Sequence, residues 1–489
     1  MPVIWTLSEP FGAKDWWPCK QSLNDKIDSI DIIVTCPRDY RDGSNGVLIS
    51  EVQIGDYKSY HWKSRYPIAA YLVALAVTNY SSYSDYVPLL NGDSLQMLNY
   101  VYPENLGEAR SGTHELINVI RLYDSLFIQY PFSKEKYGHA QFSWGGGMEH
   151  QTMTFVSGFG IDLLAHECAH QWFGDMVTCG SWSDIWLNEG FATYCEGLTN
   201  EFLYQSDWYS WKAKEIGYIV SNAGGSVFCN DTTEINRIFD GRLTYAKGAY
   251  VLHMLRWVVG DSAFFQGLKY YLTDAAISYG YARTADLQRN MELASGKDLS
   301  DFFNQWYYGE GYPSYYTLWN PTDTSVDITI EQTTSHPSVS FFSMPVPVEF
   351  TDASHDTIVV LQNTFSGQSF SVNLGFSPTN AVFDPDLWIL SAYNTLTNIN
   401  SESQSVDFID VYPVPSSNVI GVTCHVSGKN SNNLEIVNMK GERIKIISEN
   451  IVPNKVNNVS INIEKLPAGI YFIKLADSKT VLMKKFVKQ

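Results

Sequence analysis

Two histidines and two glutamates have the types and the spacing needed to bind a metal ion and use it in hydrolysis. His166 and His170 are four residues apart, so on a helix they would lie one above the other and present two imidazole nitrogens to one ion. Glu167 would lean over that ion without binding it, and Glu189 follows downstream. This H-E-x-x-H arrangement is typical of a tetrahedral zinc site with two His nitrogens, one carboxylate and one water, whose proton the spare glutamate handles.

The stretch that starts near Glu189 predicts a second helix, because Glu189, Thr193 and Glu196 share one helical face. Glu189 would supply the third zinc ligand, and Glu196 either orients a ligand histidine or is a solvated surface residue. The alternative is that both histidines are packed, hydrogen-bonded side chains. With 10 histidines in 489 residues, a chance H-E-x-x-H is expected in about one such chain in a hundred. The additional carboxylate therefore favours a zinc site.

Two further motifs flank this stretch. Upstream lies Gly145-Gly146-Gly147-Met148-Glu149-His150, and downstream lies Tyr245-Ala246-Lys247-Gly248-Ala249. Together with H-E-x-x-H and Glu189, this ordered set resembles the zinc aminopeptidases of the aminopeptidase N and leukotriene hydrolase family. The hallmarks of that family are a G-x-M-E-N strand, H-E-x-x-H with a distal Glu, and a Y-x-K-G-A helix. The resemblance implies one Zn²⁺ per chain, held by His166, His170 and Glu189.

The chemistry of such a site assigns further roles. Glu167 would take the proton of the zinc-activated water as general base and return it to the leaving amine as general acid. Tyr245, whose phenol is a donor that stays protonated at neutral pH, is by resemblance the residue that stabilises the oxyanion. Glu149 is by resemblance the carboxylate that binds the free α-amino group of the substrate. The other substrate-binding residues that the resemblance implies are Gly146, Gly147, Met148 and Glu9.

Two positions depart from the family pattern. His150 stands where the family has Asn, which changes local hydrogen bonding but not the amine anchor. In Leu7-Ser8-Glu9 only the acid of the family's Q-x-E segment is kept. Glu9 is therefore either a second contact to the substrate amine or an exposed loop carboxylate.

The combined motifs predict a zinc-dependent aminopeptidase that removes N-terminal residues from peptides with a free N-terminus. Three other functions stay open. An epoxide hydrolase at the same zinc would need a lipid pocket, and an endopeptidase would cut N-acetylated peptides. A non-catalytic, surface-displayed binding protein would show neither bound zinc nor hydrolysis.

The composition narrows the class of protein. The net charge of −19 argues against nucleic acid or an anionic membrane surface as the main partner, because both select basic faces. Seven cysteines without a C-x-x-C pair imply neither a thiolate zinc site nor a dense disulfide framework. The longest strongly apolar run, residues 68–77, is too short to span a bilayer, and residues 1–4 lack the pattern of a signal peptide.

The chain is predicted to be multidomain α+β. Residues 1–76 read as β structure, with strands in 30–34 and 68–77 and turn formers in 37–46. Their Trp16-Trp17-Pro18-Cys19 segment resembles the late part of the family's N-terminal β-sandwich, so we expect a partial sandwich that lacks the family's earlier strands. Either this sequence is truncated, which the sheet edges exposed in an incomplete sandwich favour, or the lineage has lost those strands. The family implies a thermolysin-like catalytic domain for residues 77–315, which contain helical stretches. Alternating apolar residues predict a small β-sandwich in 316–396.

The last part of the chain differs in charge. Residues 397–406 read as a polar linker, and residues 407–489 carry 11 Lys and Arg against 7 Asp and Glu. A Lys440-Gly441 turn, an A-G-x-Y strand and a basic end make this module resemble the β-sandwich sorting domain of the type IX secretion system, although Val414 replaces an Asn of its first motif. The alternative is an ordinary surface-binding β-sandwich. The resemblance implies contact with that secretion machinery and a secreted or surface location in a Gram-negative bacterium, with a signal peptide upstream.

Overall fold

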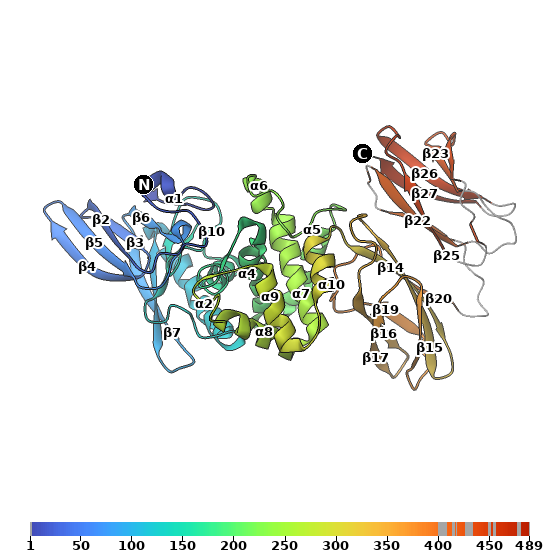
Figure 1. The fold of residues 1–489 in the computed structure, drawn as a ribbon, viewed down its shortest axis with the longest axis horizontal. Helices are drawn as coiled ribbons and strands as arrows, with labels where there is room; N and C mark the ends of the chain where they lie inside the picture. The colour runs from blue at the N-terminus through green and yellow to red at the C-terminus, as the bar shows by residue number, and fades with distance from the viewer. Residues whose placement is uncertain are drawn as a thin grey trace. The chain divides into compact units, whose positions relative to one another are not determined.

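The computed structural model describes residues 2–399, 408–412, 416, 418–425, 434–447, 451–452, 456–476 and 481–488. The chain divides into two compact units, Met1–Glu310 with Asp386–Leu390, and Gly311–Pro385 with Ser391–Gln489. The predicted multidomain α+β architecture is confirmed: β-sheets precede and follow a helical middle region (Figure 1). Residues 400–406 of the predicted linker lie outside the described residues, and the predicted domain boundaries stay predictions.

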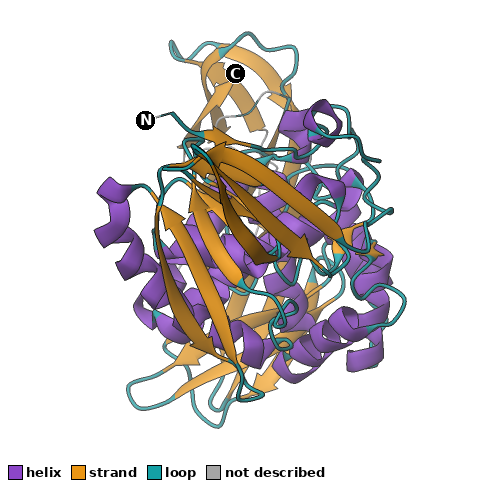
Figure 2. Cartoon of the chain, turned by 90° about the vertical axis from the view of Figure 1, so that its left-hand side faces the viewer, coloured by secondary structure: helices purple, strands orange, loops and turns teal. Residues whose placement is uncertain are grey.

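The first unit begins with two three-stranded antiparallel sheets, ordered β1-β6-β3 and β2-β5-β4. Figure 2 looks onto this end of the unit. The strands are β1 (Ile4–Trp5), β2 (Ile30–Pro37), β3 (Arg41–Ser44), β4 (Val47–Ile54), β5 (Tyr57–Ser64) and β6 (Leu75–Thr78).

Two local predictions in this region hold only in part, because turns and bends occupy only 38–39 and 45–46 of the stretch 37–46, and a strand occupies only the end of the run 68–77. The turn-forming stretch 37–46 contains β3, because its polar side chains are satisfied inside the core: the Trp62 indole donates to Asp42 at 2.8 Å, and Ser44 donates to the Ala74 carbonyl at 2.6 Å. The apolar run 68–77 is a strand only at its end, in β6. Its centre forms a buried 3-10 turn, η1 (Ala70–Leu72).

A mixed five-stranded sheet follows, in the order β10-β11-β9-β8-β7. The edge strand β10 is antiparallel to β11 and carries part of the glycine-rich motif. Strands β11, β9 and β8 run parallel to one another, and β7 at the other edge is antiparallel to β8. The strands are β7 (Ser81–Pro88), β8 (Ser94–Val101), β9 (Tyr137–Gln141), β10 (Gly147–Met148) and β11 (Thr154–Val156).

Helices make up most of the rest of the first unit, and a parallel pair, β12 (Thr178–Cys179) and β13 (Tyr281–Ala282), joins two of its loops. The described helices are α1 (Ala13–Trp16), η2 (Pro103–Asn105), α2 (Leu106–Leu126), α3 (Ile161–Ala169), η3 (Trp182–Asp184), α4 (Trp186–Leu203), α5 (Gln205–Ile219), α6 (Ile235–Ile238), η4 (Gly241–Lys247), α7 (Gly248–Val259), α8 (Asp261–Thr273), α9 (Thr284–Ser295), α10 (Ser300–Phe303) and η5 (Asn304–Tyr308). No helix in the described part of the chain is long and apolar enough to cross a membrane.

Close backbone packing brings α4 against α7. A Cβ atom built on Gly190 would lie 3.0 Å from the backbone of Gly248, and one built on Gly248 would lie 3.1 Å from Gly190. The absence of both side chains therefore sets how near the two helices approach. Beside this contact, the ring of Phe191 stacks on that of Phe173 at 4.2 Å, within the apolar core.

The second unit contains only strands among its described elements. One group forms sheets ordered β18-β15-β14-β20 and β17-β16-β19, and the predicted alternation appears in β15, where Val326, Ile328 and Ile330 are buried. These strands are β14 (Pro313–Pro321), β15 (Ser325–Thr334), β16 (Met344–Thr351), β17 (Asp356–Asn363), β18 (Gln368–Asn373), β19 (Asn380–Phe383) and β20 (Thr395–Asn398).

The last strands form two sheets, ordered β21-β22-β25 and β24-β23-β26-β27. Their buried side chains, which include Val422, Ile436 and Ile473, make one apolar core. Gly441, with a φ of 80°, lies in the turn between β23 and β24. The strands are β21 (Phe408–Tyr412), β22 (Val419–His425), β23 (Leu434–Asn438), β24 (Arg443–Ile447), β25 (Val456–Asn462), β26 (Gly469–Ala476) and β27 (Val481–Lys488).

Candidate metal centre and active site

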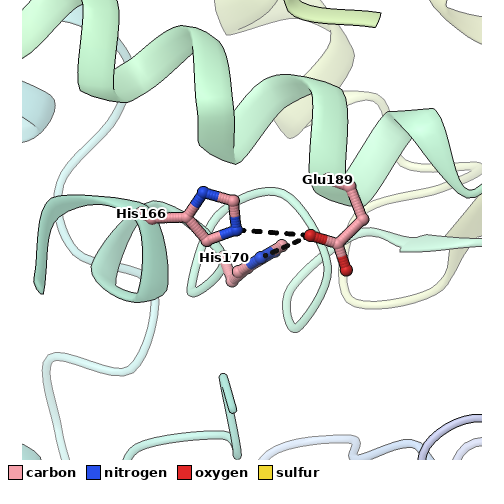
Figure 3. Close-up of side chains that lie close together, drawn as sticks. All are labelled: His166, His170 and Glu189. Carbon is pink, nitrogen blue, oxygen red and sulfur yellow. Dashed lines mark hydrogen bonds and ion pairs between the residues drawn. The ribbon is translucent and has the colours of Figure 1, made fainter. Parts of the chain in front are cut away.

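Helices α3 and α4 bring three potential metal ligands to one point. The Nε2 atoms of His166 and His170 lie 3.3 Å and 3.4 Å from the same oxygen, Oε2 of Glu189 (Figure 3). His170 directly follows α3 in helical conformation, so the two imidazoles keep the four-residue helical spacing. The side chains of His170 and Glu189 are almost completely buried. The potential ligand atoms all lie within 4.8 Å of one another.

The hydrogen bonds behind the two imidazoles fit a cation between them. His166 Nδ1 lies 2.7 Å from Oε1 of Glu196, and His170 Nδ1 lies 3.0 Å from the Phe173 carbonyl oxygen. The carbonyl can only accept, so His170 Nδ1 donates and its Nε2 lone pair points toward Glu189. The Glu196 carboxylate favours the same tautomer in His166. Two lone pairs and a carboxylate oxygen directed at one point are a suitable ligand set for zinc.

Removing the acceptor behind His166 should weaken metal binding. Glu196→Ala is expected to lower zinc affinity by about 10- to 100-fold, because His166 loses the partner that fixes its ring and tautomer. Competition with a chromogenic chelator measures this affinity. Glu196→Gln keeps an acceptor oxygen and is expected to retain most of it. An Ala variant that binds zinc as tightly as the parent would assign Glu196 to the solvated surface.

Glu167 lies between the metal ligands and the glycine-rich motif. A Cβ atom on Gly147 would lie 2.3 Å from Oε1 of Glu167, so the missing side chain at position 147 makes room for this carboxylate. Within the described residues, Glu167 Oε2 has no hydrogen-bond partner. Burial raises the pKa of Glu167 to about 8. The carboxyl group is therefore close to the ligands and free to exchange a proton.

Two more carboxylates extend the cluster on the side of His170. Potential ligand atoms of Glu149, Glu167 and His170 lie within 4.8 Å of one another, as do those of Glu9, Glu149 and Glu189. Burial, followed by repulsion from Glu149, raises the pKa of Glu9 well above its ordinary value. Glu9 thus lies among the site carboxylates, with its Oε1 atom buried.

Tyr245 comes from the π-helical segment η4. Its ring stacks on that of His166, with centroids 5.9 Å apart and planes at 15°. Asp240 caps the start of η4, accepting from the backbone N–H groups of Arg242 and Leu243 at 2.9 Å each. Burial, together with nearby carboxylates led by Glu189, raises the pKa of Tyr245 well above its ordinary value. Its hydroxyl therefore keeps its proton and remains a donor.

One cavity of about 570 Å³ connects these groups. Its charged lining residues are Glu9, Glu149, Asp162, Glu167, Glu189 and Glu196, and no Lys or Arg of the described part of the chain lines it. Gly146, Gly147 and Met148 line it as well, so every predicted site residue borders one space. A cavity with this surplus of carboxylates attracts a metal ion and a substrate ammonium group.

Two residues near the site were not predicted from the sequence. The Tyr71 hydroxyl lies 3.3 Å from Oε1 of Glu149, and the Asn188 amide donates to that hydroxyl at 3.2 Å. Tyr71 stands in the apolar run that was interpreted as a strand, where its hydroxyl is the one polar side-chain group between Ile68 and Val77. A single hydroxyl in an otherwise apolar run was the feature of the sequence that could have indicated a role for Tyr71.

His150 shows how the departure from the family motif is accommodated. The residue is fully buried, and its ring packs against Phe155 with centroids 4.4 Å apart. Burial lowers the pKa of His150 to about 3, so the ring is neutral at physiological pH. Neither ring nitrogen has a hydrogen-bond partner among the described residues, so His150 packs as an apolar group would.

Comparison with known proteins identifies two regions of the chain. Residues 160–306 match the peptidase family M1 domain, and residues 410–489 match a secretion system C-terminal sorting domain. The probable aminopeptidase 2 of Sulfurisphaera tokodaii is 26% identical over 365 residues, which are 66% of this chain and 44% of that protein. The tricorn protease-interacting factor F2 of Thermoplasma volcanium is 30% identical over 346 residues, covering 64% and 41%. The chain thus spans less than half the length of these relatives.

Two solved structures of M1 zinc metallopeptidase and aminopeptidase type are similar to this chain. An M1 zinc metallopeptidase mutant of Deinococcus radiodurans, bound to a Tyr-Ser-Ala substrate, has a TM-score of 0.55 and 25% identity, covering 63% of this chain and 69% of its own. Aminopeptidase A of Legionella pneumophila has a TM-score of 0.67 and 18% identity, covering 80% and 48%, and supports the fold alone.

Proposed function

Because the chain belongs to peptidase family M1, we propose that it is a zinc-dependent aminopeptidase that hydrolyses the N-terminal peptide bond of peptides. The observation that carries the proposal is the position of Glu149: a buried carboxylate within 4.8 Å of a metal-ligand histidine and of Glu167. This arrangement would hold a substrate ammonium group one residue away from the bond that is cut.

The three ligands His166, His170 and Glu189 would hold one zinc ion per chain. When bound, zinc lowers the pKa of water and polarises a carbonyl oxygen. Glu167 takes the proton from the attacking water and returns it to the leaving amine. The Tyr245 hydroxyl donates a hydrogen bond to the oxyanion that forms at the carbonyl. Glu149, with Glu9 beside it, fixes the substrate amine, while Gly146, Gly147 and Met148 border the bound peptide.

A panel of aminoacyl-nitroanilides, assayed with and without chelator, tests this function directly. We expect hydrolysis of substrates with a free amine, its loss with chelator, and its return with added zinc. Equal cleavage of N-acetylated and free peptides would instead support an endopeptidase. Absence of both bound zinc and hydrolysis would support a non-catalytic binding protein, and turnover of an epoxide lipid would reveal the related hydrolase activity.

Glu149→Gln tests the amine anchor. The variant is expected to retain zinc and to lower kcat/KM for free-amine substrates by about 10- to 100-fold, because a charge-assisted hydrogen bond to the ammonium is lost. Steady-state kinetics and metal analysis of the same preparation measure the two properties. Unchanged kcat/KM, or loss of zinc equal to the loss of activity, would contradict this role.

We further propose that the sorting domain directs the enzyme to the cell surface or the medium of a Gram-negative bacterium through the type IX secretion machinery. Deleting residues 407–489 is expected to leave the enzyme in the periplasm, while the purified shortened protein keeps full peptidase activity, because no site residue lies in that segment. Fractionation and nitroanilide assays measure both. Surface delivery of the shortened protein would assign this module to binding.

A further inference from the structure

Tyr71 connects the two halves of the candidate site. Its hydroxyl lies 3.3 Å from Oε1 of Glu149 and 3.2 Å from Nδ2 of Asn188, the residue before the metal ligand Glu189. The side chain is only 3% exposed. Tyr71 lies in η1, Glu149 directly follows β10, and Asn188 lies in the first turn of α4, so the phenol connects three parts of the chain that are distant in sequence.

The hydrogen bonds run in one direction. Asn188 Oδ1 accepts from the backbone N–H of Cys179 at 3.0 Å, which fixes the amide so that Nδ2 faces Tyr71. An amide nitrogen can only donate, so the Tyr71 oxygen accepts from Asn188. The phenolic proton is then directed to the Glu149 carboxylate.

The backbone around Tyr71 is fixed beside the same motif. The Asn45 amide donates to the carbonyl oxygens of Leu72 at 2.9 Å and Gln151 at 2.7 Å, and thereby ties η1 to the segment that follows Glu149. The Trp182 ring packs edge-on against the Tyr71 ring at 5.8 Å. The backbone and the ring of Tyr71 are therefore held in place, and the phenolic oxygen stays beside Glu149.

Glu149 needs a donor of this kind because most of its close neighbours are carboxylates. Glu9, Glu167 and Glu189 lie near it together with His170, and the three carboxylates offer no hydrogen-bond donor that would fix the orientation of its charged side chain. A Lys or Arg partner would hold the carboxylate but would also neutralise the charge that attracts the substrate ammonium. A neutral phenol orients one oxygen and leaves the negative charge for the substrate.

We propose that Tyr71 is a positioning residue for amine recognition: through its hydroxyl it orients the Glu149 carboxylate toward the free α-amino group of the substrate. The inference rests on the proposed aminopeptidase function and adds to it a residue outside the matched M1 region, residues 160–306. Tyr71 acts through Glu149 and does not itself contact the reacting atoms.

The test compares two ligands that differ only in the amine: leucine hydroxamate and its des-amino analogue, 4-methylpentanohydroxamic acid. Calorimetric titration of the zinc-loaded full chain needs no turnover. The parent is expected to bind the amine-bearing ligand more tightly, and Tyr71→Phe is expected to reduce that preference about tenfold, the effect of losing one hydrogen bond to a charged group. Affinity for the des-amino ligand should stay unchanged, because the metal centre and the ring packing are intact.

Tyr80→Phe is the matched control. Tyr80 is also 3% exposed and lies in the same unit, and its hydroxyl donates at 2.6 Å to the carbonyl oxygen of Gln141, which is not a site residue. The Tyr80→Phe variant should keep the preference of the parent for the amine-bearing ligand. It thereby distinguishes the loss of any buried hydroxyl from the loss of the Tyr71 hydroxyl. Asn188→Asp provides a second variant: it keeps the acceptor for Cys179 but removes the amide donor, so Tyr71 donates to position 188 and the preference should again fall.

The outcomes separate the two proposals. If the parent prefers the amine-bearing ligand and both Tyr71→Phe and Asn188→Asp keep that preference at saturating zinc, the role of Tyr71 is wrong and the aminopeptidase proposal stands. If the parent binds both hydroxamates equally, Glu149 does not recognise an amine and both proposals fail. A selective loss in the two variants, with Tyr80→Phe unaffected, supports the inference.

Discussion

Glu167→Gln is expected to retain zinc and to lose about 10³- to 10⁴-fold in kcat, the largest effect of a single substitution at this site. Gln has the shape of Glu and fits the space that Gly147 leaves open. The three ligands His166, His170 and Glu189 are untouched. What the amide lacks is the capacity to accept a proton from water and return it to the leaving amine, so proton transfer is lost while metal binding remains.

Nitroanilide turnover and metal content, measured on the same sample, check this expectation. Glu108→Gln is a suitable control because it removes the same charge from an exposed position on α2, and it should behave as the parent. If Glu167→Gln loses metal in proportion to activity, Glu167 is a ligand rather than the base.

Tyr245→Phe is expected to lower kcat by about 10²- to 10³-fold with little change in KM, as for loss of one oxyanion donor. The phenyl ring can still stack on His166, so this candidate ligand keeps its ring contact. Only the hydroxyl is removed. Since that donor interacts with charge that develops during the reaction, its loss should weaken transition-state binding and leave ground-state binding intact.

Steady-state kinetics measure kcat and KM separately, and zinc analysis shows whether the variant still binds the metal. Tyr80→Phe again serves as the control for a buried hydroxyl. A rise in KM with unchanged kcat would make Tyr245 a substrate contact and would leave the oxyanion without its proposed donor.

The sequence predicted which residues meet at the candidate site better than it predicted the elements that carry them. The spacing of His166 and His170 requires only one turn of helix, and the structure places both Nε2 atoms against Glu189. Their binding of zinc stays a prediction. The family resemblance supplied Glu149 and Tyr245, whose meeting depends on long-range packing that local patterns do not encode.

The departures from these local predictions have a common physical cause. Residues 37–46 look like a turn because Asp, Ser, Asn and Gly favour turns in water, yet burial beside the partners of Asp42 and Ser44 makes a strand of 41–44. In the run 68–77, apolar character is compatible with strand or turn, and tertiary contacts selected η1. Tyr71 escaped notice for the same reason, since its partners are distant in sequence.

The contact between Gly190 and Gly248 makes the distance between two helices a control on reactivity. Gly190 follows the candidate ligand Glu189, and Gly248 lies three residues after Tyr245 in the same motif, so a single methyl group at either position would push the candidate metal centre and the Tyr245 hydroxyl apart. Such a variant would slow the reaction without altering any reacting group. Loss of activity on substitution of these glycines therefore reports a change in the spacing of the two helices. Side chains of increasing size at these positions would vary this spacing, and with it the reaction rate, while every reacting group stays the same.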